Sequence, residues 1–179
     1  MKKHLKKFNA NKWGKLHGDC AIRALVLGIG IDYEMACKML KVRCVPNEGY
    51  VAEDGNEGTG IDLDLIQETF SKFLGEIEDN LLADPDVDPM KAMLNAKPLD
   101  KWLDDKDYKN PGLYLLYLDD NKEHDGGHIV FADCRAEPKY FDISDCGDMG
   151  VQAWIKIEKR LSKDSKYHYK YDIKNHKFI

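Results

Sequence analysis

The sequence predicts an α+β fold, because the two halves of the chain carry different hydrophobic patterns. Before Asn110 the apolar residues mostly recur three or four positions apart, as on one face of a helix. After Gly112 they alternate with polar residues or form short apolar blocks, which is typical of strands. Helices followed by antiparallel strands indicate the α+β class. The length of 179 residues suits one domain with its own core, so we expect a single domain over 1–179, with a basic lead-in at 1–17, a mainly helical half at 18–110 and a mainly strand half at 111–179.

The helical half begins with two predicted short helices. The first spans residues 20–27, because Gly28 and Gly30 follow it and glycine commonly ends a helix. Asp32 is a good N-cap for the second helix, which we expect to reach Leu40. The apolar stripe of this second helix would consist of Met35, Ala36 and Met39.

A third, longer helix is predicted to open at residues 59–62 and to run to about Leu74. The spacing at its start is that of a capping box, with Asp62 in place of the usual Glu or Gln. The preceding segment 46–58 is rich in glycine and acid and is expected to be a loop. Short helical pieces at 90–96 and 99–104 would follow, and then five strands at 113–118, 128–133, 139–143, 152–158 and 167–173.

The composition limits the classes of partner. A net charge of -5 gives no general case for nucleic-acid binding, and a basic terminus is more typical of a solvated tail. No segment has the length of a transmembrane helix, and no apolar stretch follows the basic start as in a signal peptide. We therefore expect no membrane partner and a cytoplasmic location, in a host cell or in a virion if the protein is viral. The 5 cysteines are an odd number without a dense framework, so we expect reduced thiols. They contain no CxxC pair, and we expect no metal and no cofactor.

Cys20 is the candidate nucleophile, because it follows the Gly18–Asp19 pair and opens an apolar helix. Backbone N–H groups and the macrodipole at a helix start favour negative charge. A thiol there therefore ionises more easily than its reference pKa of about 8.5 implies. Asp19 would oppose this ionisation if its carboxylate lay beside the sulfur. We expect Asp19 to cap the helix instead.

Acyl transfer by a thiol also needs a base and a group that orients the base. His128 opens a predicted strand behind Gly126 and Gly127, and these glycines would let a backbone or a substrate approach closely. Asp142 and Asp145 stand at the end of the next strand, and either carboxylate is suited to bond the far nitrogen of the imidazole. Each residue alone has an ordinary structural explanation. Their order along the chain and their places on the predicted elements together indicate a thiol active site.

Three motifs resemble those of small papain-like cysteine peptidases of phages and bacteria. They are Gly-Asp-Cys-x-x-Arg-Ala at 18–24, Gly-His at 127–128 and Tyr-Phe-Asp-x-x-Asp-Cys-Gly at 140–147. The core of the first motif is also similar to the nucleophile motif of OTU deubiquitinases. The third motif is similar to the strand that delivers the third triad residue in papain and in bacteriocin-processing C39 peptidases.

The resemblance implies a papain-like fold, with N-terminal helices packed on a C-terminal antiparallel sheet. It also implies a catalytic triad of Cys20, His128 and Asp145, since Asp145 takes the place of the family's Asn or Asp. Asp142 is the alternative third residue. A peptidase or isopeptidase with this triad would act on a protein or peptide substrate through a covalent acyl-enzyme.

The sequence departs from these families at the position of the oxyanion donor. The glutamine that papain carries six residues before its cysteine is Gly14 here, and the aspartate that OTU enzymes carry three residues before it is His17. The N–H of Cys20 would then bind the oxyanion together with a second donor, for which His17 and Asn11 are candidates.

Two alternatives to the hydrolase stay open. A catalytically silent papain-like binding or structural protein of phage origin would fit the missing glutamine, and a Cys20→Ala variant of it would behave as the wild type does. An acyltransferase or transglutaminase would use the same triad with an amine acceptor, and it would favour transfer over hydrolysis.

Overall fold

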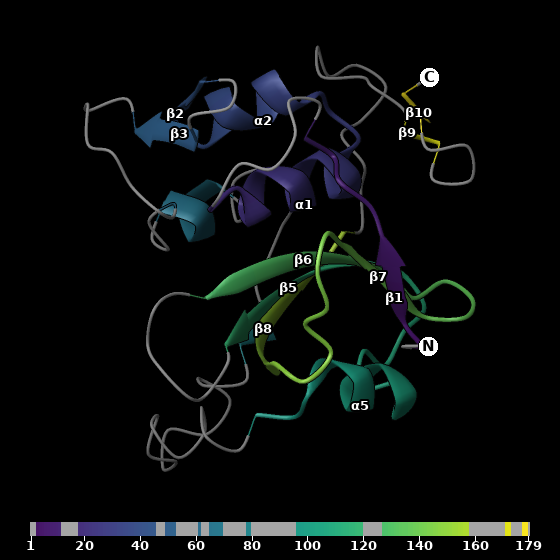
Figure 1. Ribbon diagram of the computed structural model, residues 1–179. Helices are drawn as coiled ribbons and strands as arrows, with labels where there is room; N and C mark the ends of the chain where they lie inside the picture. Colours follow the sequence, from purple (N-terminus) through teal and green to yellow (C-terminus); the bar gives the residue numbers. More distant parts are fainter. Residues whose placement is uncertain are drawn as a thin grey trace. The chain divides into compact units, whose positions relative to one another are not determined.

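The computed structural model describes residues 3–11, 18–45, 49–52, 61, 65–69, 78–79, 96–119, 127–157, 171–172 and 177–178 (Figure 1). The chain forms two compact units. Unit 1 consists of Met1–Phe8 and Glu76–Lys156, and unit 2 of Asn9–Gly75 and Ile157–Ile179. Both units contain helix and strand, so the α+β prediction is confirmed, while the papain-like fold and the single domain stay predictions. None of the helices in the described part of the chain has the length and apolar content that crossing a bilayer requires.

Unit 1 is built on a 6-stranded sheet with the order β1-β7-β6-β5-β8-β4. The central strand β5 is buried along almost its whole length, which explains its continuous run of apolar residues. The four strands predicted between 113 and 158 are confirmed to within two residues at each end, whereas β4 was not predicted. The strands are β1 (Leu5–Lys7), β4 (Glu78–Asp79), β5 (Leu113–Asp119), β6 (His128–Asp133), β7 (Lys139–Asp142) and β8 (Gly150–Lys156).

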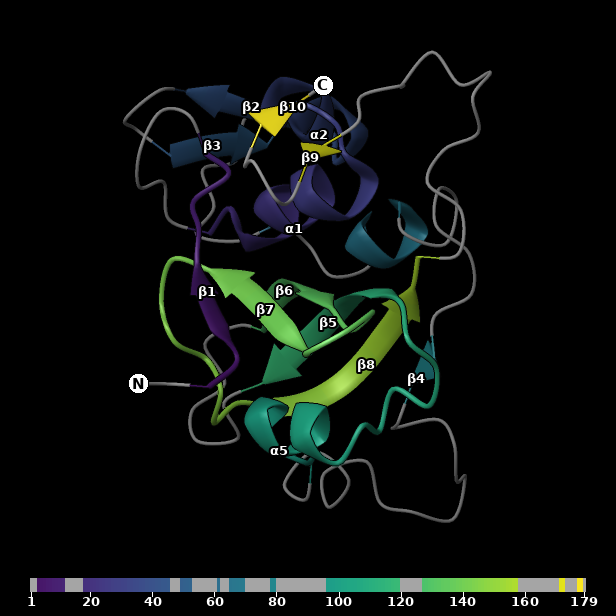
Figure 2. The same cartoon turned by 90° about the vertical axis from the view of Figure 1, so that its right-hand side faces the viewer.

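The sheet is mixed, because β1 pairs with β7 in parallel while the other neighbouring strands are antiparallel (Figure 2). Leu5 lies opposite Tyr140, and Lys7 lies opposite Asp142. The predictions of a wholly antiparallel sheet and of an irregular lead-in are therefore wrong at residues 5–7. The physical reason is that β7 would otherwise expose an edge of unpaired backbone groups, which a strand from any part of the chain can satisfy.

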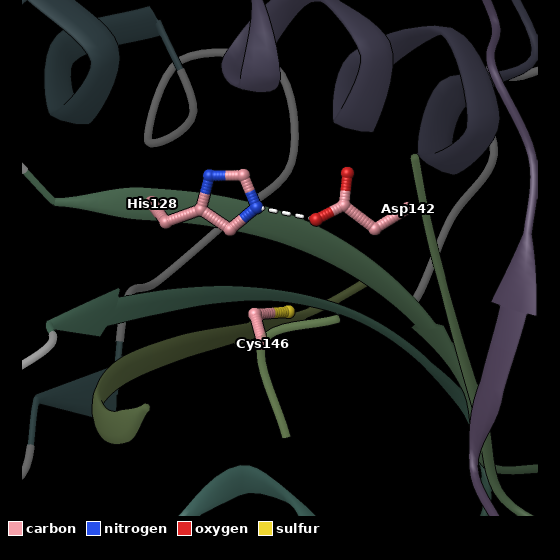
Figure 3. A group of neighbouring side chains, drawn as sticks. All are labelled: His128, Asp142 and Cys146. Atoms are coloured by element: carbon pink, nitrogen blue, oxygen red, sulfur yellow. Dashed lines mark hydrogen bonds and ion pairs between the residues drawn. The ribbon is translucent and has the colours of Figure 1, made fainter. Parts of the chain in front are cut away.

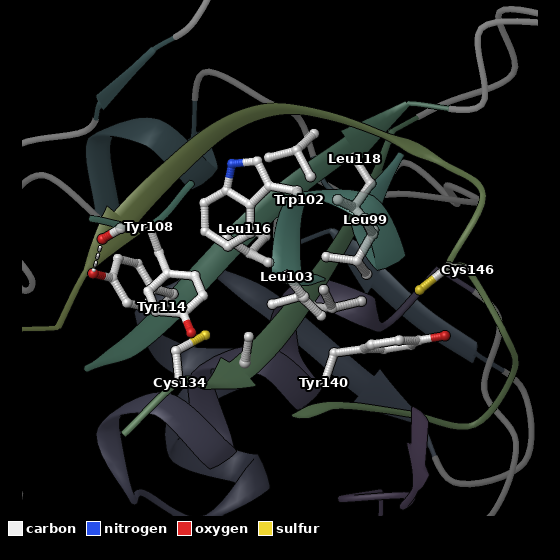
Figure 4. Packing of buried hydrophobic residues seen from close by; sticks show 13 residues of the cluster. Leu99, Trp102, Leu103, Tyr108, Tyr114, Leu116, Leu118, Cys134, Tyr140 and Cys146 are labelled. Carbon is white, nitrogen blue, oxygen red and sulfur yellow. Dashed lines mark hydrogen bonds between the residues drawn. The ribbon is translucent and has the colours of Figure 1, made fainter. Parts of the chain in front are cut away.

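Helix α5 (Leu99–Asp104) forms at the residues where a short helix is predicted, and it packs on the sheet of unit 1 (Figure 4). The Leu99 N–H donates to the Met149 carbonyl, and the Asp100 N–H donates to the Gly147 carbonyl, both at 2.9 Å. These bonds tie the loop between β7 and β8 to the start of the helix. The buried cluster comprises Leu99, Trp102, Leu103, Tyr108, Tyr114, Leu116, Leu118, Val130, Ala132, Cys134, Tyr140, Cys146 and Val151.

Unit 2 contains the two predicted short helices and a hairpin. Helix α1 (Cys20–Ile29) is longer than predicted, because Gly28 lies inside it and Gly30, with φ of 76°, forms its left-handed C-cap. The hairpin was not predicted, and residues 49–52 of the expected loop form its second strand. The other elements of this unit are α2 (Tyr33–Met39), β2 (Val42–Val45), β3 (Gly49–Ala52), a helical segment at 65–69, β9 (Tyr171–Asp172) and β10 (Lys177–Phe178).

Helix α2 begins as the sequence indicates but buries a different face. The Asp32 side chain accepts the Met35 N–H at 2.8 Å, which confirms the N-cap. The buried residues of the helix are Tyr33, Ala36 and Cys37 instead of the expected stripe with Met35 and Met39. Cys37 is disulfide-bonded, so the expectation of reduced thiols is wrong at this residue. Of the predicted third helix, 65–69 is helical and the remainder, apart from residue 61, lies outside the described residues, as do 90–95 and 167–170.

Candidate functional site

His128 and Asp142 form a hydrogen-bonded pair where two neighbouring strands of the sheet meet (Figure 3). His128 is the first residue of β6 and Asp142 the last of β7, and these strands are antiparallel neighbours, so both residues lie at the same end of the strands. The distance from His128 Nε2 to Asp142 Oδ2 is 2.6 Å, and the side chains are 21% and 2% exposed. An ionised carboxylate only accepts hydrogen bonds, so Nε2 carries the hydrogen and Nδ1 is the nitrogen suited to exchange a proton with a reacting group.

Asp142 is itself held in place by the backbone. Its other oxygen, Oδ1, accepts the Ile143 N–H at 2.7 Å. Two hydrogen bonds in different directions define the plane of the carboxylate, and the carboxylate in turn defines the orientation of the ring. A buried, fixed acceptor is the kind of group that keeps a catalytic imidazole in one tautomer.

Asp145, the preferred third triad residue, bonds other partners. Its Oδ1 accepts the Tyr140 hydroxyl at 2.6 Å and the Gly147 N–H at 3.0 Å. The second bond is that of an Asx turn, in which the side chain accepts an N–H two residues further on. The preference for Asp145 is therefore corrected to the alternative, Asp142, because β7 ends at Asp142 and Asp145 lies in the turn beyond it.

A cysteine that the sequence analysis left without a role joins this pair. The ligand atoms of His128, Asp142 and Cys146 all lie within 4.8 Å of one another. Cys146 is 3% exposed, and its burial raises the pKa of its thiol, while a hydrogen bond with His128 acts in the opposite direction. The signal in the sequence was a cysteine directly after the carboxylates at the strand end.

Cys20 is the first residue of α1, as predicted. Its side chain is partly exposed and carries a thiol, not a disulfide. Cys20 belongs to unit 2, whereas His128 and Asp142 belong to unit 1. The pairing of Cys20 with His128 therefore stays a prediction.

Asp19 occupies the N-cap position of α1, as expected, but its side chain makes no capping hydrogen bond, which corrects that part of the expectation. Its Oδ1 accepts Arg23 Nε at 2.9 Å, and its Oδ2 accepts the Tyr33 hydroxyl at 2.8 Å and Asn11 Nδ2 at 3.0 Å. Arg23 stands four residues further along the helix, and a charged donor binds a carboxylate more strongly than a neutral backbone N–H does. The result is a buried polar network directly before Cys20.

Asn11 is committed to this network and is not suited to bind an oxyanion. It is 5% exposed, and its Nδ2 donates to both Asp19 and, at 3.2 Å, the Tyr33 hydroxyl. These two bonds use both amide hydrogens. The other candidate donor, His17, lies outside the described residues, together with Gly14.

Position 127 has room only for glycine, because a neighbouring side chain lies against its backbone. The ring of Tyr117, on the adjacent strand β5, occupies the space that a Cβ atom at Gly127 would take. The expected close approach to a glycine before His128 is therefore made by an aromatic ring. Gly126 lies outside the described residues.

No protein-family model, curated protein or solved structure matches the chain. The chemistry of the side chains described above is therefore the basis for a functional assignment. The resemblance to papain-like peptidases stays a prediction.

Proposed function

We propose that the protein is a papain-like cysteine hydrolase, either a peptidase or an isopeptidase. In this proposal Cys20 is the nucleophile, His128 relays its proton, and Asp142 holds the imidazole. The observation that carries the proposal is the bond of 2.6 Å between His128, which is partly exposed, and the buried carboxylate of Asp142. A buried carboxylate that fixes an accessible imidazole is what a thiol or hydroxyl nucleophile needs from its base.

Exposure and pKa favour Cys20 over Cys146 as the nucleophile. Cys20 is partly exposed and opens a helix of 10 residues, whose N-terminal N–H groups stabilise a thiolate. Cys146 is 3% exposed, and burial raises the pKa of its thiol. The thiolate, not the thiol, attacks a carbonyl carbon, so the raised pKa of Cys146 disfavours it as the nucleophile.

The reaction would proceed in two steps. The Cys20 sulfur forms a bond to the carbonyl carbon, the bond from that carbon to the amine nitrogen breaks, and the imidazolium of His128 gives its proton to the leaving amine. Water then attacks the thioester while His128 accepts a proton from it, which releases the acid and restores the thiol. Asp142 stays ionised throughout and stabilises the imidazolium.

A substrate-independent test uses an electrophilic thiol-protease probe and intact-mass spectrometry of the full-length protein. We expect one adduct, mapped to Cys20, that is lost in Cys20→Ala and forms more slowly in His128→Ala. Cys146→Ser is the matched control and should label as the wild type does. The proposal fails if the adduct lies on Cys146, or if Cys20 reacts no faster than a free cysteine at neutral pH.

A second test asks whether Cys20 and His128 meet in solution. A His128→Cys substitution in a Cys146→Ser background should form a disulfide with Cys20 under mild oxidation, detected as a cross-linked peptide. Absence of this cross-link in a folded variant would show that residue 128 and the Cys20 sulfur do not come into contact, which would contradict the proposed pair. Activity assays then distinguish the alternatives: hydrolysis indicates a peptidase, and transfer to an added amine indicates an acyltransferase.

A further inference from the structure

We infer that His128, Asp142 and Cys146 form a binding site for a thiophilic divalent metal ion, and that Zn²⁺ is the ion that these donors fit best. The three ligand atoms lie within 4.8 Å of one another (Figure 3). All three residues belong to unit 1, so the site is complete within one compact unit. This inference goes beyond the proposed hydrolase and is tested separately from it, and a bound ion would occupy the His128 and Asp142 side chains that the hydrolase needs free.

The backbone holds the three donors in place. His128 starts β6 and Asp142 ends β7, so the pairing of these two strands fixes their separation. Cys146 lies in the loop after β7. The next residue, Gly147, donates its N–H to Asp145 and accepts from the Asp100 N–H at the start of α5. The loop is thus tied to the helix on one side and to its own turn on the other, which makes Cys146 a fixed donor.

The three donors also select the class of metal. An imidazole nitrogen, a carboxylate oxygen and a thiolate sulfur are the ligand types that zinc takes in proteins. Ca²⁺ and Mg²⁺ require mainly oxygen ligands, so the nitrogen and sulfur donors disfavour both ions. Three protein ligands leave one tetrahedral position for water or a small ligand, and the partly exposed side of His128 would give access to it.

The separations are close to those of a tetrahedral site. Zinc bonds of about 2.0 to 2.3 Å place neighbouring ligand atoms roughly 3.3 to 3.6 Å apart. The His128–Asp142 distance of 2.6 Å would therefore open by less than about 1 Å, with the ion in place of the shared hydrogen. Any wider separation among the three ligand atoms is at most 4.8 Å and would close by no more than about 1.5 Å.

The charges balance when the ion binds. The Cys146 thiol releases one proton, and the resulting thiolate and the Asp142 carboxylate together neutralise the two positive charges of the metal. The hydrogen on Nε2 of His128 moves to Nδ1 by exchange with water, so the imidazole stays neutral and Nε2 supplies its lone pair. Binding therefore releases one proton, that of the Cys146 thiol, and becomes weaker as the pH falls.

The test is a titration of the full-length protein with Co²⁺, after treatment with a chelator and under nitrogen. We expect one ion per chain and a near-ultraviolet sulfur-to-cobalt charge-transfer band, which Zn²⁺ abolishes by displacement. Cys146→Ser should remove this band. His128→Ala and Asp142→Asn should weaken binding by more than about 100-fold, the upper end of the loss when only an outer-shell partner is removed.

Two other cysteines provide matched controls. Cys134 belongs to the same buried cluster as Cys146, and Cys20 is the proposed nucleophile, so Cys134→Ser and Cys20→Ser should both keep the band. The inference is overturned if the wild type shows no band, if Cys146→Ser retains it, or if Cys20→Ser loses it. If circular dichroism shows that Cys146→Ser does not fold, the Co²⁺ affinity of His128→Ala tests the inference instead, because His128 is partly exposed. An unchanged affinity in His128→Ala would overturn the inference. Labelling of Cys20 by the thiol-protease probe in the metal-free protein tests the proposed hydrolase separately.

Discussion

Asp142 accepts a hydrogen bond from His128 Nε2 at 2.6 Å, while its other oxygen accepts the backbone N–H of Ile143. Asp142 is 2% exposed, so water does not compete for either bond. The orientation of the imidazole is therefore set by the last residue of β7. Any chemistry at His128, whether proton transfer or metal binding, depends on this carboxylate.

Substitution of Asp142 should slow the labelling of Cys20 by the thiol-protease probe. Asp142→Asn keeps the shape of the side chain, yet the same replacement in a comparable triad costs about 10⁴-fold, because the amide lets the imidazole take the wrong tautomer. Asp142→Ala should slow labelling as well, because it removes the group that fixes the ring. Asp145→Asn is the matched control and should have little effect, since Asp145 bonds Tyr140 instead. If Asp145→Asn slowed the labelling of Cys20 more than Asp142→Asn did, Asp145 would be the orienting residue instead.

Cys134 should resist alkylation in the folded protein. Burial raises the pKa of its thiol to about 12, with a smaller contribution from the neighbouring Asp133 carboxylate. At pH 7 its thiolate fraction is then about 10⁻⁵. Peptide mapping after timed exposure to iodoacetamide should show Cys20 modified first and Cys134 only after unfolding in urea. Equal rates at the two residues would show that the core around Cys134 opens readily.

Asp19→Ala should destabilise the protein strongly. The substitution leaves Arg23 buried without its carboxylate partner and removes the acceptor of Tyr33 and Asn11. Breaking a buried ion pair in this way costs about 3–5 kcal/mol of unfolding free energy. Urea denaturation followed by circular dichroism measures the change.

The exposed Asp133–Arg135 pair provides the control for this measurement. The Arg135 side chain is 54% exposed, and its bond to Asp133 spans 2.6 Å. Arg135→Ala should therefore cost less than about 1 kcal/mol, as exposed ion pairs usually do. Similar losses for Asp19→Ala and Arg135→Ala would mean that the Asp19 network is hydrated in solution.

The attachment of β1 should weaken in acid. Hydrogen bonds from Lys3, and to a smaller extent from His4, lower the pKa of Asp104 below its ordinary value. A lowered pKa in the folded state means that the stabilisation is complete above the unfolded pKa of about 3.9. It is lost as the pH falls through the still lower folded pKa.

Hydrogen exchange at Tyr140 reports on this attachment, because its N–H donates to the His4 carbonyl at 3.0 Å. The protection factor of this amide should fall in the wild type when the pH drops below about 4. In Asp104→Asn it should be lower at neutral pH and change less with acid. A wild-type protection factor that stays constant over this range would contradict the anchoring role of Asp104.

The sequence by itself determined the local elements and the type of chemistry. Asp32 caps its helix through a bond within three residues, and the glycine that ends α1 acts through its own backbone angle. The strand that begins at His128 follows from a short continuous apolar block at 129–132. Caps and apolar blocks depend on residues close together in the chain, so the order of residues is sufficient to predict them.

Only the tertiary structure decided which groups meet. Asp142 and Asp145 are the same residue type three positions apart, and the end of β7 decides which of them bonds His128. Residues 5–7 become a strand because β7 offers them an edge more than 130 residues away in the chain. Cys146 approaches the imidazole because its loop is tied to α5. Such contacts depend on strand register and turn geometry, which arise from the packing of distant segments and leave no local pattern in the sequence.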